Sequence, residues 1–313
     1  MELPSSKPKV SVCVVTYNQA GFIRECLQSL VDQKTNFFFE VIVGDDASTD
    51  NTGDIAQEFA DAYPGLVKLI RHKTNVGPTR NYLAVHQMAM GDYVSHIDGD
   101  DCAMPGKLQA QADLLDQRMD ISFTVHAVKV IDTDKKIERS KNFPIQGSLH
   151  DLLNLGTYFV HSSVMYRKCN EFVHDPAAGE IVDYFFHIER ASWGDIYFDD
   201  RILGGYRIHE GGISKSLKDR EMLEVCYENA FDRALSFGID FAVVQSARLK
   251  RRMAFAISAF MMGEKGAYKR KVFLSDNDYP YATGKHRALH WSRSVPVLMQ
   301  IYMRVRNAQS NRG

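Results

Sequence analysis

Apolar and polar positions follow two different periods along the first hundred residues. Nearly continuous apolar runs at residues 9–16 (KVSVCVVT) and 37–43 (FFFEVIV) are typical of strands that are covered on both faces. Further strands are predicted over residues 66–71 and 93–97. Between these runs apolar residues recur at helical spacing, which predicts helices over residues 22–31, 52–62 and 78–90. Strands that alternate with helices in this way predict a parallel, doubly wound α/β sheet.

The pattern changes after residue 101. A helix is predicted over residues 105–118, a strand of alternating type over 121–131, and another strand over 161–168. From residue 220 onward the chain is mainly helical in pattern, with a Pro/Gly/Asp-rich break at 275–284. We therefore expect two domains, an α/β domain at residues 1–219 and a helical extension at 220–313.

Polar side chains gather where three of the predicted strands end. The strand ends carry Thr16–Asn18, Asp45–Asp50 and Asp98–Asp101. In doubly wound sheets ligands bind beyond the carboxyl ends of the strands, so these segments are expected at one edge. Carboxylates this close repel one another unless a cation lies between them. Oxygen-rich clusters suit hard divalent cations, so the pattern predicts a Mn²⁺ or Mg²⁺ site.

Several classes of protein are excluded by missing patterns. The sequence has no GxGxxG after its first strand and no GxxxxGK[ST], so neither a dinucleotide fold nor a P-loop is supported. The five cysteines lie far apart, which excludes the usual zinc spacing and indicates no disulfide framework. We find no signal-peptide pattern and no apolar run long enough for a membrane span, which predicts a cytoplasmic protein. No nucleic-acid-binding pattern is present.

Four segments in this order resemble family 2 glycosyltransferases with the GT-A fold. They are VSVCVVTYNQAGFIRECLQSLVDQ, VIVGDDASTDNT, NVGPTRN and YVSHIDGDD. The resemblance covers about residues 9–215. It implies a mixed, nucleotide-sugar-binding sheet and inverting transfer of a sugar from a nucleoside-diphosphate sugar, most simply a UDP-sugar, to a hydroxyl.

The resemblance also implies residue roles. Thr16 and Tyr17 would flank the nucleobase, Asp46 would accept a hydrogen bond from a pyrimidine N–H with Asp45 in support, and Arg80 would reach the ribose–phosphate region. The implied nucleotide-sugar-binding residues are Thr16, Tyr17, Asn18, Asp45, Asp46, Asn75, Arg80, Asp98, Gly99, Asp100 and Arg207. The implied metal ligands are Asp100, Asp101 and His209.

An inverting transfer needs a base for the acceptor hydroxyl. The family places a carboxylate at the start of a helix, usually directly after a Glu, and Asp183 aligns with it. Here Val182 stands where that Glu is usual, so the residue that would orient the base is missing. Glu180 is the alternative base.

Two further segments carry candidate ligands. YRIHEGGIS (residues 206–214) resembles the family segment that closes over the donor diphosphate, with His209 on metal or phosphate and Arg207 or Ser214 on phosphate oxygens. His161 and Ser162 are candidates for the acceptor side.

Each motif has a purely structural alternative. Asp45 and Asp46 could build an Asx turn that caps the next helix, and Asp183 could be an ordinary helix N-cap. Arg80 could be a surface cation and Tyr17 a packing residue. A non-catalytic nucleotide-sugar-binding protein on the same fold is the alternative function.

Charge is distributed unevenly although the formal net charge is only −1. Residues 250–313 contain 13 Lys or Arg and 3 Asp or Glu, against 25 and 36 in the rest of the chain. Residues 286–307 mix aromatic and aliphatic side chains with arginines, as do helices on anionic membrane surfaces. A packed C-terminal helix with a basic face is the equal alternative. The family resemblance implies a nucleotide-sugar donor and a glycan or lipid-linked acceptor as partners. The basic segment adds the inner face of an anionic membrane. The sequence leaves open whether the protein is a monomer or an oligomer.

Overall fold

The computed structural model describes residues 7–168, 181–209 and 217–261. The chain divides into two compact units, Met1–Ile213 and Ser214–Gly313, and each is described by itself. The domain boundary after residue 219 stays a prediction, because compactness does not test whether each part folds alone.

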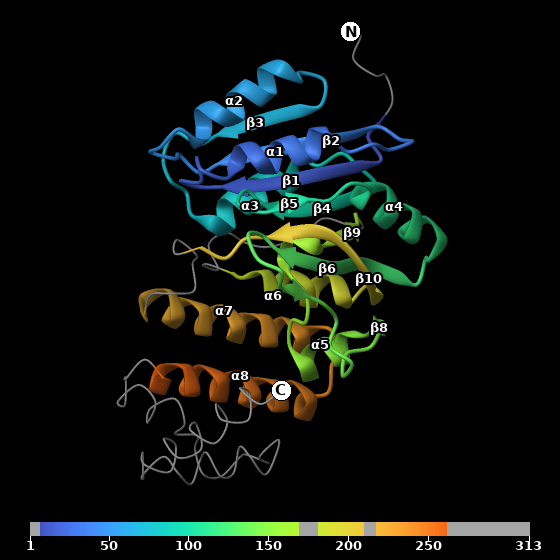
Figure 1. Cartoon of the computed structure of the whole chain (residues 1–313). Helices are drawn as coiled ribbons and strands as arrows, with labels where there is room; N and C mark the ends of the chain where they lie inside the picture. Colours follow the sequence, from blue (N-terminus) through green and yellow to red (C-terminus); the bar gives the residue numbers. More distant parts are fainter. Residues whose placement is uncertain (1–6, 169–180, 210–216, 262–313) are drawn as a thin grey trace. The chain divides into compact units, whose positions relative to one another are not determined.

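Four parallel strands form the first half of the sheet. They are β1 Val10–Thr16, β2 Phe39–Asp45, β3 Val67–Arg71 and β4 Tyr93–Asp98. Their order is β3-β2-β1-β4, as Figure 1 shows, and all three pairings are parallel. β1 and β2 are almost entirely buried, as their unbroken apolar runs predict.

The second half of the sheet makes it mixed. Its strands are β5 Cys102–Ala103, β6 Ile121–Val130, β9 Met165–Arg167 and β10 Asp195–Tyr206, with the short β7 Lys136–Ile137 and β8 Gln146–Gly147 paired to β6 and β10. β9 runs antiparallel to both β4 and β6, whereas β10 is parallel to β6. The described strands thus form one ten-stranded sheet.

Two predicted strands differ from the structure. β6 is buried on both faces except at Lys129, because it lies between β9 and β10 and helices cover it, so the alternating assignment was wrong. Residues 161–168 are not one strand. They form a 3₁₀ turn, η1 His161–Ser163, and then the short β9, so His161 and Ser162 lie on the turn.

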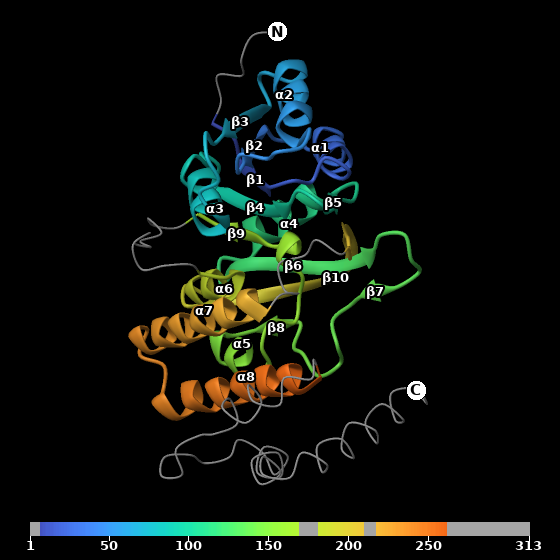
Figure 2. The same ribbon diagram turned by 90° about the vertical axis from the view of Figure 1, so that its left-hand side faces the viewer.

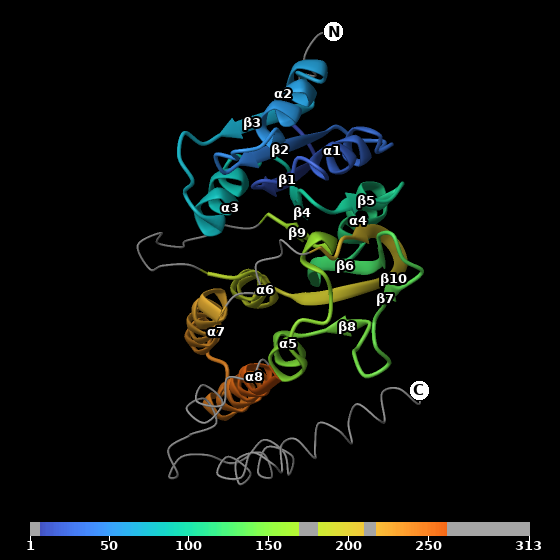
Figure 3. The same ribbon diagram turned by 60° about the vertical axis from the view of Figure 1, so that its left-hand side comes forward.

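Helices cover both faces of the sheet. They are α1 Ile23–Val31, α2 Thr52–Ala62, α3 Pro78–Gln87, α4 Lys107–Gln117, α5 Leu149–Leu155 and α6 Asp183–Ala191. α1 and α4 lie on one face, and α3 and α6 on the other (Figures 2 and 3). α3 ends before its predicted limit of residue 90, because the N–H groups of Met90 and Gly91 donate to the Ser11 hydroxyl and leave the helical pattern.

The parallel register determines where the candidate site lies. Thr16 at the end of β1 is paired with Asp45 on β2, and Val15 is paired with Asp98 on β4. The three polar strand ends therefore meet at one edge of the sheet, as the sequence predicted.

The second unit contains α7 Leu217–Ser236 and α8 Phe241–Met261. The two helices pack together through the rings of Tyr227 and Phe255 and through an ion pair of Arg252 with Glu228. Among the helices of the described ranges, none combines the length and apolarity that a membrane crossing requires. The basic segment at 286–307 lies outside the described residues.

Candidate active site

The turn that follows β4, Asp98–Asp101, is named the aspartate turn below. The carboxylate of Asp98 accepts a hydrogen bond from the hydroxyl of Ser162 (3.2 Å) and contacts Nε2 of His96 at 3.1 Å, and its backbone N–H donates to the Ser162 hydroxyl at 3.0 Å. Gly99 is required by space, because an added Cβ would lie 2.6 Å from Oε1 of Gln19 and 2.8 Å from the side chain of Thr16. The turn therefore packs directly against the end of β1.

The end of β10 approaches the same turn from far along the chain. The backbone N–H of Arg207 donates to Oδ1 of Asp101 at 2.8 Å, and Nε2 of His209 lies 2.7 Å from Oδ2 of Asp100. The other oxygen of Asp101, Oδ2, is buried and has no hydrogen-bond partner among the described residues. Within the described ranges, one buried carboxylate oxygen of the turn is thus left for a ligand to satisfy.

The carboxylates of the aspartate turn are at least partly buried and repel one another, and few cationic groups of the described ranges lie near to compensate their charge. Burial, and after it the charge of Asp98, raise the pKa of Asp101 to about 8 and also raise the pKa of Asp100. The only described cationic group bonded to the Asp100 carboxylate is His209, which carries charge only when protonated. A hard divalent cation held by Asp100, Asp101 and His209 would satisfy the unpartnered oxygen and relieve the repulsion, so these residues fit the predicted metal.

Asp183 is the first residue of α6, where the family resemblance requires the base. The approach to α6 is held by Thr79, whose hydroxyl donates to the carbonyl of Ile181 (3.2 Å) and accepts from its N–H (3.1 Å). The alternative base, Glu180, lies outside the described residues, as does Ser214.

Tyr206, the last residue of β10, is half-buried. Burial raises the pKa of its hydroxyl, and the carboxylates of Asp101, Asp98, Asp100 and Asp183 raise it further, in that order. Geometry links Asp183 to the aspartate turn through η1, because a ligand atom of His161 lies within 4.8 Å of one of Asp183 and the neighbouring Ser162 bonds to Asp98.

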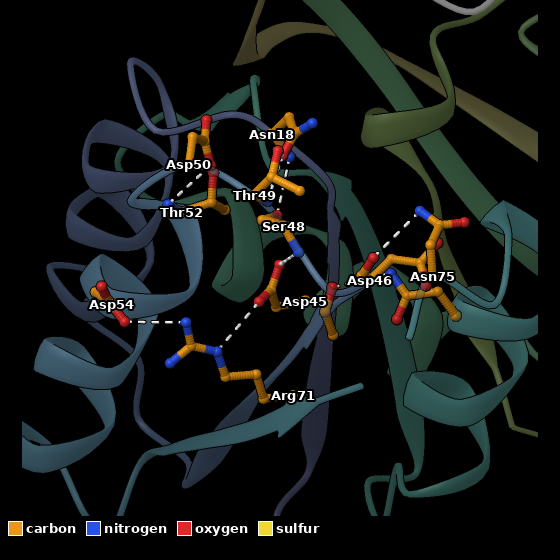
Figure 4. Close-up of polar contacts among 12 residues, drawn as sticks. Asn18, Asp45, Asp46, Ser48, Thr49, Asp50, Thr52, Asp54, Arg71 and Asn75 are labelled. Carbon is orange, nitrogen blue, oxygen red and sulfur yellow. Dashed lines mark hydrogen bonds and ion pairs between the residues drawn. The ribbon is translucent and has the colours of Figure 1, made fainter. Parts of the chain in front are cut away.

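The end of β2 presents two carboxylates with different surroundings (Figure 4). Asp45 is fully buried, accepts a hydrogen bond from the N–H of Ser48 and lies 3.6 Å from Nε of Arg71. Asp45 thus contacts only groups of the protein itself among the described residues, and its supporting role in nucleotide binding stays a prediction.

Asp46 holds the turn that precedes α3. Its two carboxylate oxygens accept from the N–H groups of Val76 (2.7 Å) and Gly77 (3.0 Å), and Nδ2 of Asn75 donates to its backbone carbonyl (3.2 Å; Figure 4). Gly77 has φ +90°, a conformation that favours glycine. An ionised carboxylate has about four acceptor positions, so Asp46 keeps capacity for a nucleobase N–H.

The three residues Thr16, Tyr17 and Asn18 at the end of β1 have different surroundings. The hydroxyl of Thr16 donates to Oε1 of Gln19, and Oδ1 of Asn18 accepts from the N–H of Thr49 (Figure 4). Tyr17, between them, is 46% exposed. Of these three predicted nucleotide contacts, Tyr17 and Asn18 are exposed and Thr16 is buried, and only the Tyr17 ring is a stacking surface.

The two predicted phosphate-binding arginines differ. Arg80 is exposed on α3. The guanidinium of Arg207 is bonded to Glu25 (2.5 Å) and to the carbonyl of Asp100 (3.0 Å), and it lies 3.4 Å from Asp132. Arg207 thus positions the aspartate turn by both backbone and side chain.

Sequence reasoning missed three residues of this region. His96 contacts Asp98, Tyr206 has a pKa that burial and four carboxylates raise, and His187 lies near Asp183 and His161, their ligand atoms all within 4.8 Å of one another. Asp183 and His187 are four residues apart on a predicted helix, so the sequence could have shown that they share one face of it. The proximity of His161 had no sequence signal.

Comparison with known sequences identifies the class. The fold and the carboxylate-rich strand ends define a GT-A glycosyltransferase. Residues 11–173 match the sequence profile of Glycosyl transferase family 2, and the chain belongs to this family. An uncharacterized protein of Mycobacterium tuberculosis is 31% identical over 82% of this chain and 75% of its own length. The putative glycosyltransferase EpsE of Bacillus subtilis is 32% identical over 52% of this chain and 58% of its own.

Solved structures share the fold at low sequence identity. TarS of S. aureus in complex with UDP-GlcNAc matches with a TM-score of 0.62 and 19% identity, over 84% of this chain and 79% of that one. The mannosyltransferase PcManGT from Pyrobaculum calidifontis, in complex with GDP-Man and Mn²⁺, matches with a TM-score of 0.52 and 16% identity, over 95% and 87%. These likenesses confirm the predicted fold class.

Proposed function

We propose that this glycosyltransferase moves a sugar, with inversion, from a nucleoside-diphosphate sugar to a hydroxyl of a glycan or lipid-linked acceptor, using Mn²⁺ or Mg²⁺. The observation that carries the proposal is the carboxylate cluster of the aspartate turn, where Oδ2 of Asp101 is buried without a hydrogen-bond partner among the described residues, together with Asp183 at the start of α6. A base and a metal-binding carboxylate cluster at one site are the two parts that such a transfer needs.

The donor is assigned to the strand-end edge. The exposed ring of Tyr17 is suited to stack on a nucleobase, and Asp46 has acceptor capacity for its N–H. Arg80 is the exposed cation of the same edge. The complexes of TarS with UDP-GlcNAc and of PcManGT with GDP-Man support a nucleoside-diphosphate sugar, and we favour a UDP-sugar.

The cation is assigned to Asp100, Asp101 and His209. The buried, unpartnered Oδ2 of Asp101 and the raised pKa of both carboxyls support this assignment, as does the Mn²⁺ in the complex of PcManGT. When bound, the cation neutralises charge that develops on the departing diphosphate. Arg207 and Gly99 keep the turn in the required shape.

Asp183 is proposed as the base of a single displacement. The acceptor oxygen forms a bond to the anomeric carbon while the bond from that carbon to the diphosphate oxygen breaks, and the acceptor proton passes to the Asp183 carboxylate. Its position at the start of α6 is the one where the family resemblance has the base. Glu180 is the second candidate for this role.

The proposed site of action is the inner face of a membrane, in the synthesis of a cell-surface polysaccharide or glycoconjugate. Residues 250–313 contain 13 basic and 3 acidic residues. This positive charge supports contact with an anionic surface, where a lipid-linked acceptor would lie.

Three variants test the proposal. D101N should lose metal-dependent binding of UDP or UDP-sugar in calorimetry. D183N should keep this binding and lose transfer by about 10²–10⁴-fold, the usual contribution of a general base. D92N is the matched control, because Asp92 lies just before β4 at its opposite end, is exposed and pairs with Lys7.

Two results would count against this assignment. Wild-type turnover by D183N would remove Asp183 as the base. Binding that is absent for every nucleotide sugar, with and without Mn²⁺, would contradict the donor class itself.

A further inference from the structure

A second group of possible metal ligands lies beside the aspartate turn. His161 is on η1, and Asp183 and His187 are on α6; one ligand atom from each lies within 4.8 Å of the others. Residues four apart on a helix project from the same face, which explains the pair on α6. η1 is held near by Ser162, which bonds to Asp98.

The histidines of this group have ring nitrogen atoms that no described residue satisfies. His187 is fully buried, and neither Nδ1 nor Nε2 has a hydrogen-bond partner in the described part of the chain; Nδ1 of His161 lacks one too. Leaving a buried polar group unsatisfied costs about 1–3 kcal/mol. Ring contacts of His187 with Phe159 (4.8 Å) and His161 (5.1 Å) explain its packing but leave the ring nitrogens unpaired.

Both imidazoles are in the form that binds metals. Burial lowers the pKa of His161 and of His187 well below the usual range, so both rings are neutral near pH 7 and carry a free lone pair. His161 and Asp183 are only partly buried, which leaves the group open to an ion from solvent.

We propose that His161, Asp183 and His187 form a second cation site, selective for Zn²⁺, and that Zn²⁺ bound there inhibits sugar transfer. Two imidazoles and one carboxylate are a usual ligand set for zinc with one position left open, whereas Mg²⁺ and Mn²⁺ prefer surroundings rich in oxygen, such as the carboxylates of the aspartate turn. The inhibition rests on the proposed function of Asp183, because a carboxylate that ligates Zn²⁺ no longer accepts the acceptor proton.

Zinc binding is tested first, independently of activity. Zn²⁺ is titrated calorimetrically into the full chain with Mg²⁺ in excess, for wild type, H187F and H126F. Phe keeps the ring that packs at position 187. His126 is the matched control, since it is also buried with an unpartnered Nε2 but lies outside the group. We expect one site that H187F weakens by more than about 100-fold, since even groups that only orient a ligand contribute 10–100-fold.

A second measurement tests the site even if the H187F variant does not fold. Co²⁺ added to wild type in place of Zn²⁺ should give the visible absorption of a four-coordinate ion with nitrogen ligands, and Zn²⁺ should remove it. H161F should lose this absorption and H126F should keep it. Equal Zn²⁺ affinity in wild type, H187F and H161F would overturn the site.

The inhibition is tested with saturating Mn²⁺ and donor. Zn²⁺ should inhibit transfer by wild type and H126F, and H187F should resist it; equal inhibition of H187F and wild type would overturn the inhibitory role. Zinc binding that depends on His187, together with full transfer by D183N, would support the site, overturn the inhibition and remove Asp183 as the base. The two proposals can thus fail separately.

Discussion

Gly99 shows at the scale of one residue how the aspartate turn depends on close packing. The absence of a Cβ there lets the turn rest against Thr16 and Gln19, which brings Asp98, Asp100 and Asp101 to the end of β1. Burial, and after it the repulsion from Asp98, raise the pKa of Asp100 and Asp101. The site is therefore arranged for a cation by sterics as well as by charge.

We predict that G99A weakens Mn²⁺-dependent nucleotide binding by at least about tenfold and lowers the free energy of unfolding by about 1–3 kcal/mol, as overpacking commonly does. The added Cβ would meet the Thr16 side chain at 2.8 Å, so the turn must move. G21A is the control, because nothing lies within 4 Å of a Cβ at that position. Calorimetry and urea unfolding measure the two effects, and equal results for G99A and G21A would contradict the steric argument.

Lys107 is a buried lysine that ties α4 to the sheet. It is 1% exposed and donates to Oε1 of Gln111 (2.9 Å) and the hydroxyl of Ser95 (3.3 Å). Burial lowers its pKa from 10.5 to about 7. Between these values the unfolded chain binds more protons than the folded one, so the contribution of Lys107 to stability rises as the pH rises from about 7 to about 10.5.

The variant K107M should therefore gain stability over wild type near pH 7, and the gain should shrink toward pH 9 by at most about 1.4 kcal/mol per pH unit. Urea unfolding at several pH values measures the difference. K129M, which changes an exposed lysine of β6, should follow wild type at every pH. A pH-independent difference between K107M and wild type would show that Lys107 is not the group responsible.

At the scale of one element, α6 carries much of the proposed chemistry. Asp183, His187 and Arg190 lie four and three residues apart on it, and every residue from Tyr184 to Ala191 is buried. Its starting point is determined by the hydroxyl of Thr79 on α3, which bonds to both backbone groups of Ile181. The segment that contains Thr79 also donates the hydrogen bonds to Asp46, so one segment positions both Asp46 and the start of α6.

We predict that T79V lowers kcat by at least about tenfold while the donor Kd stays within about twofold, because misplacing a catalytic group by about 1 Å can cost about 100-fold. Valine keeps the shape but has no hydroxyl, so both bonds to Ile181 are lost. T79S keeps the hydroxyl and should retain activity. Single-turnover kinetics and calorimetry separate the two quantities, and equal kcat in T79V and T79S would contradict a positioning role.

At the scale of the whole molecule, charge is divided between the acidic main part and the basic C-terminal part. This division was read from the sequence alone, and residues 286–307 lie outside the described structure. We predict that the full chain sediments with vesicles of anionic phospholipid at low salt and is released by ~0.5 M salt, since screening shortens the range of surface charges.

The matched test changes the four arginines of this segment, Arg287, Arg293, Arg304 and Arg306, to Gln. Binding to anionic vesicles should fall by at least about tenfold, since each basic residue near such a surface contributes about 1 kcal/mol. Vesicles of zwitterionic lipid are the control. Unchanged binding in the variant would favour the packed-helix alternative.

Elements with a strong local pattern were predictable. β1 and β2 follow from their continuous apolar runs, and α2 begins and ends at its predicted residues, Thr52 and Ala62. Residues 161–168 were mistaken for one strand, because a short turn followed by three strand residues resembles a single apolar run. Burial of β6 on both faces was unpredictable, since it depends on neighbours far away in the sequence.

The sequence by itself determined the sheet edge, the aspartate turn and the family, because strand ends and short motifs are local and the parallel register of β1, β2 and β4 brings their ends together. Only the tertiary structure decided which groups surround these carboxylates. Arg207 is bonded within the protein, Oδ2 of Asp101 is left without a described partner, and His161 meets His187 across elements that no sequence pattern connects. The physical reason is that contacts and burial depend on how distant segments pack, whereas periodicity reports only the nearest neighbours along the chain.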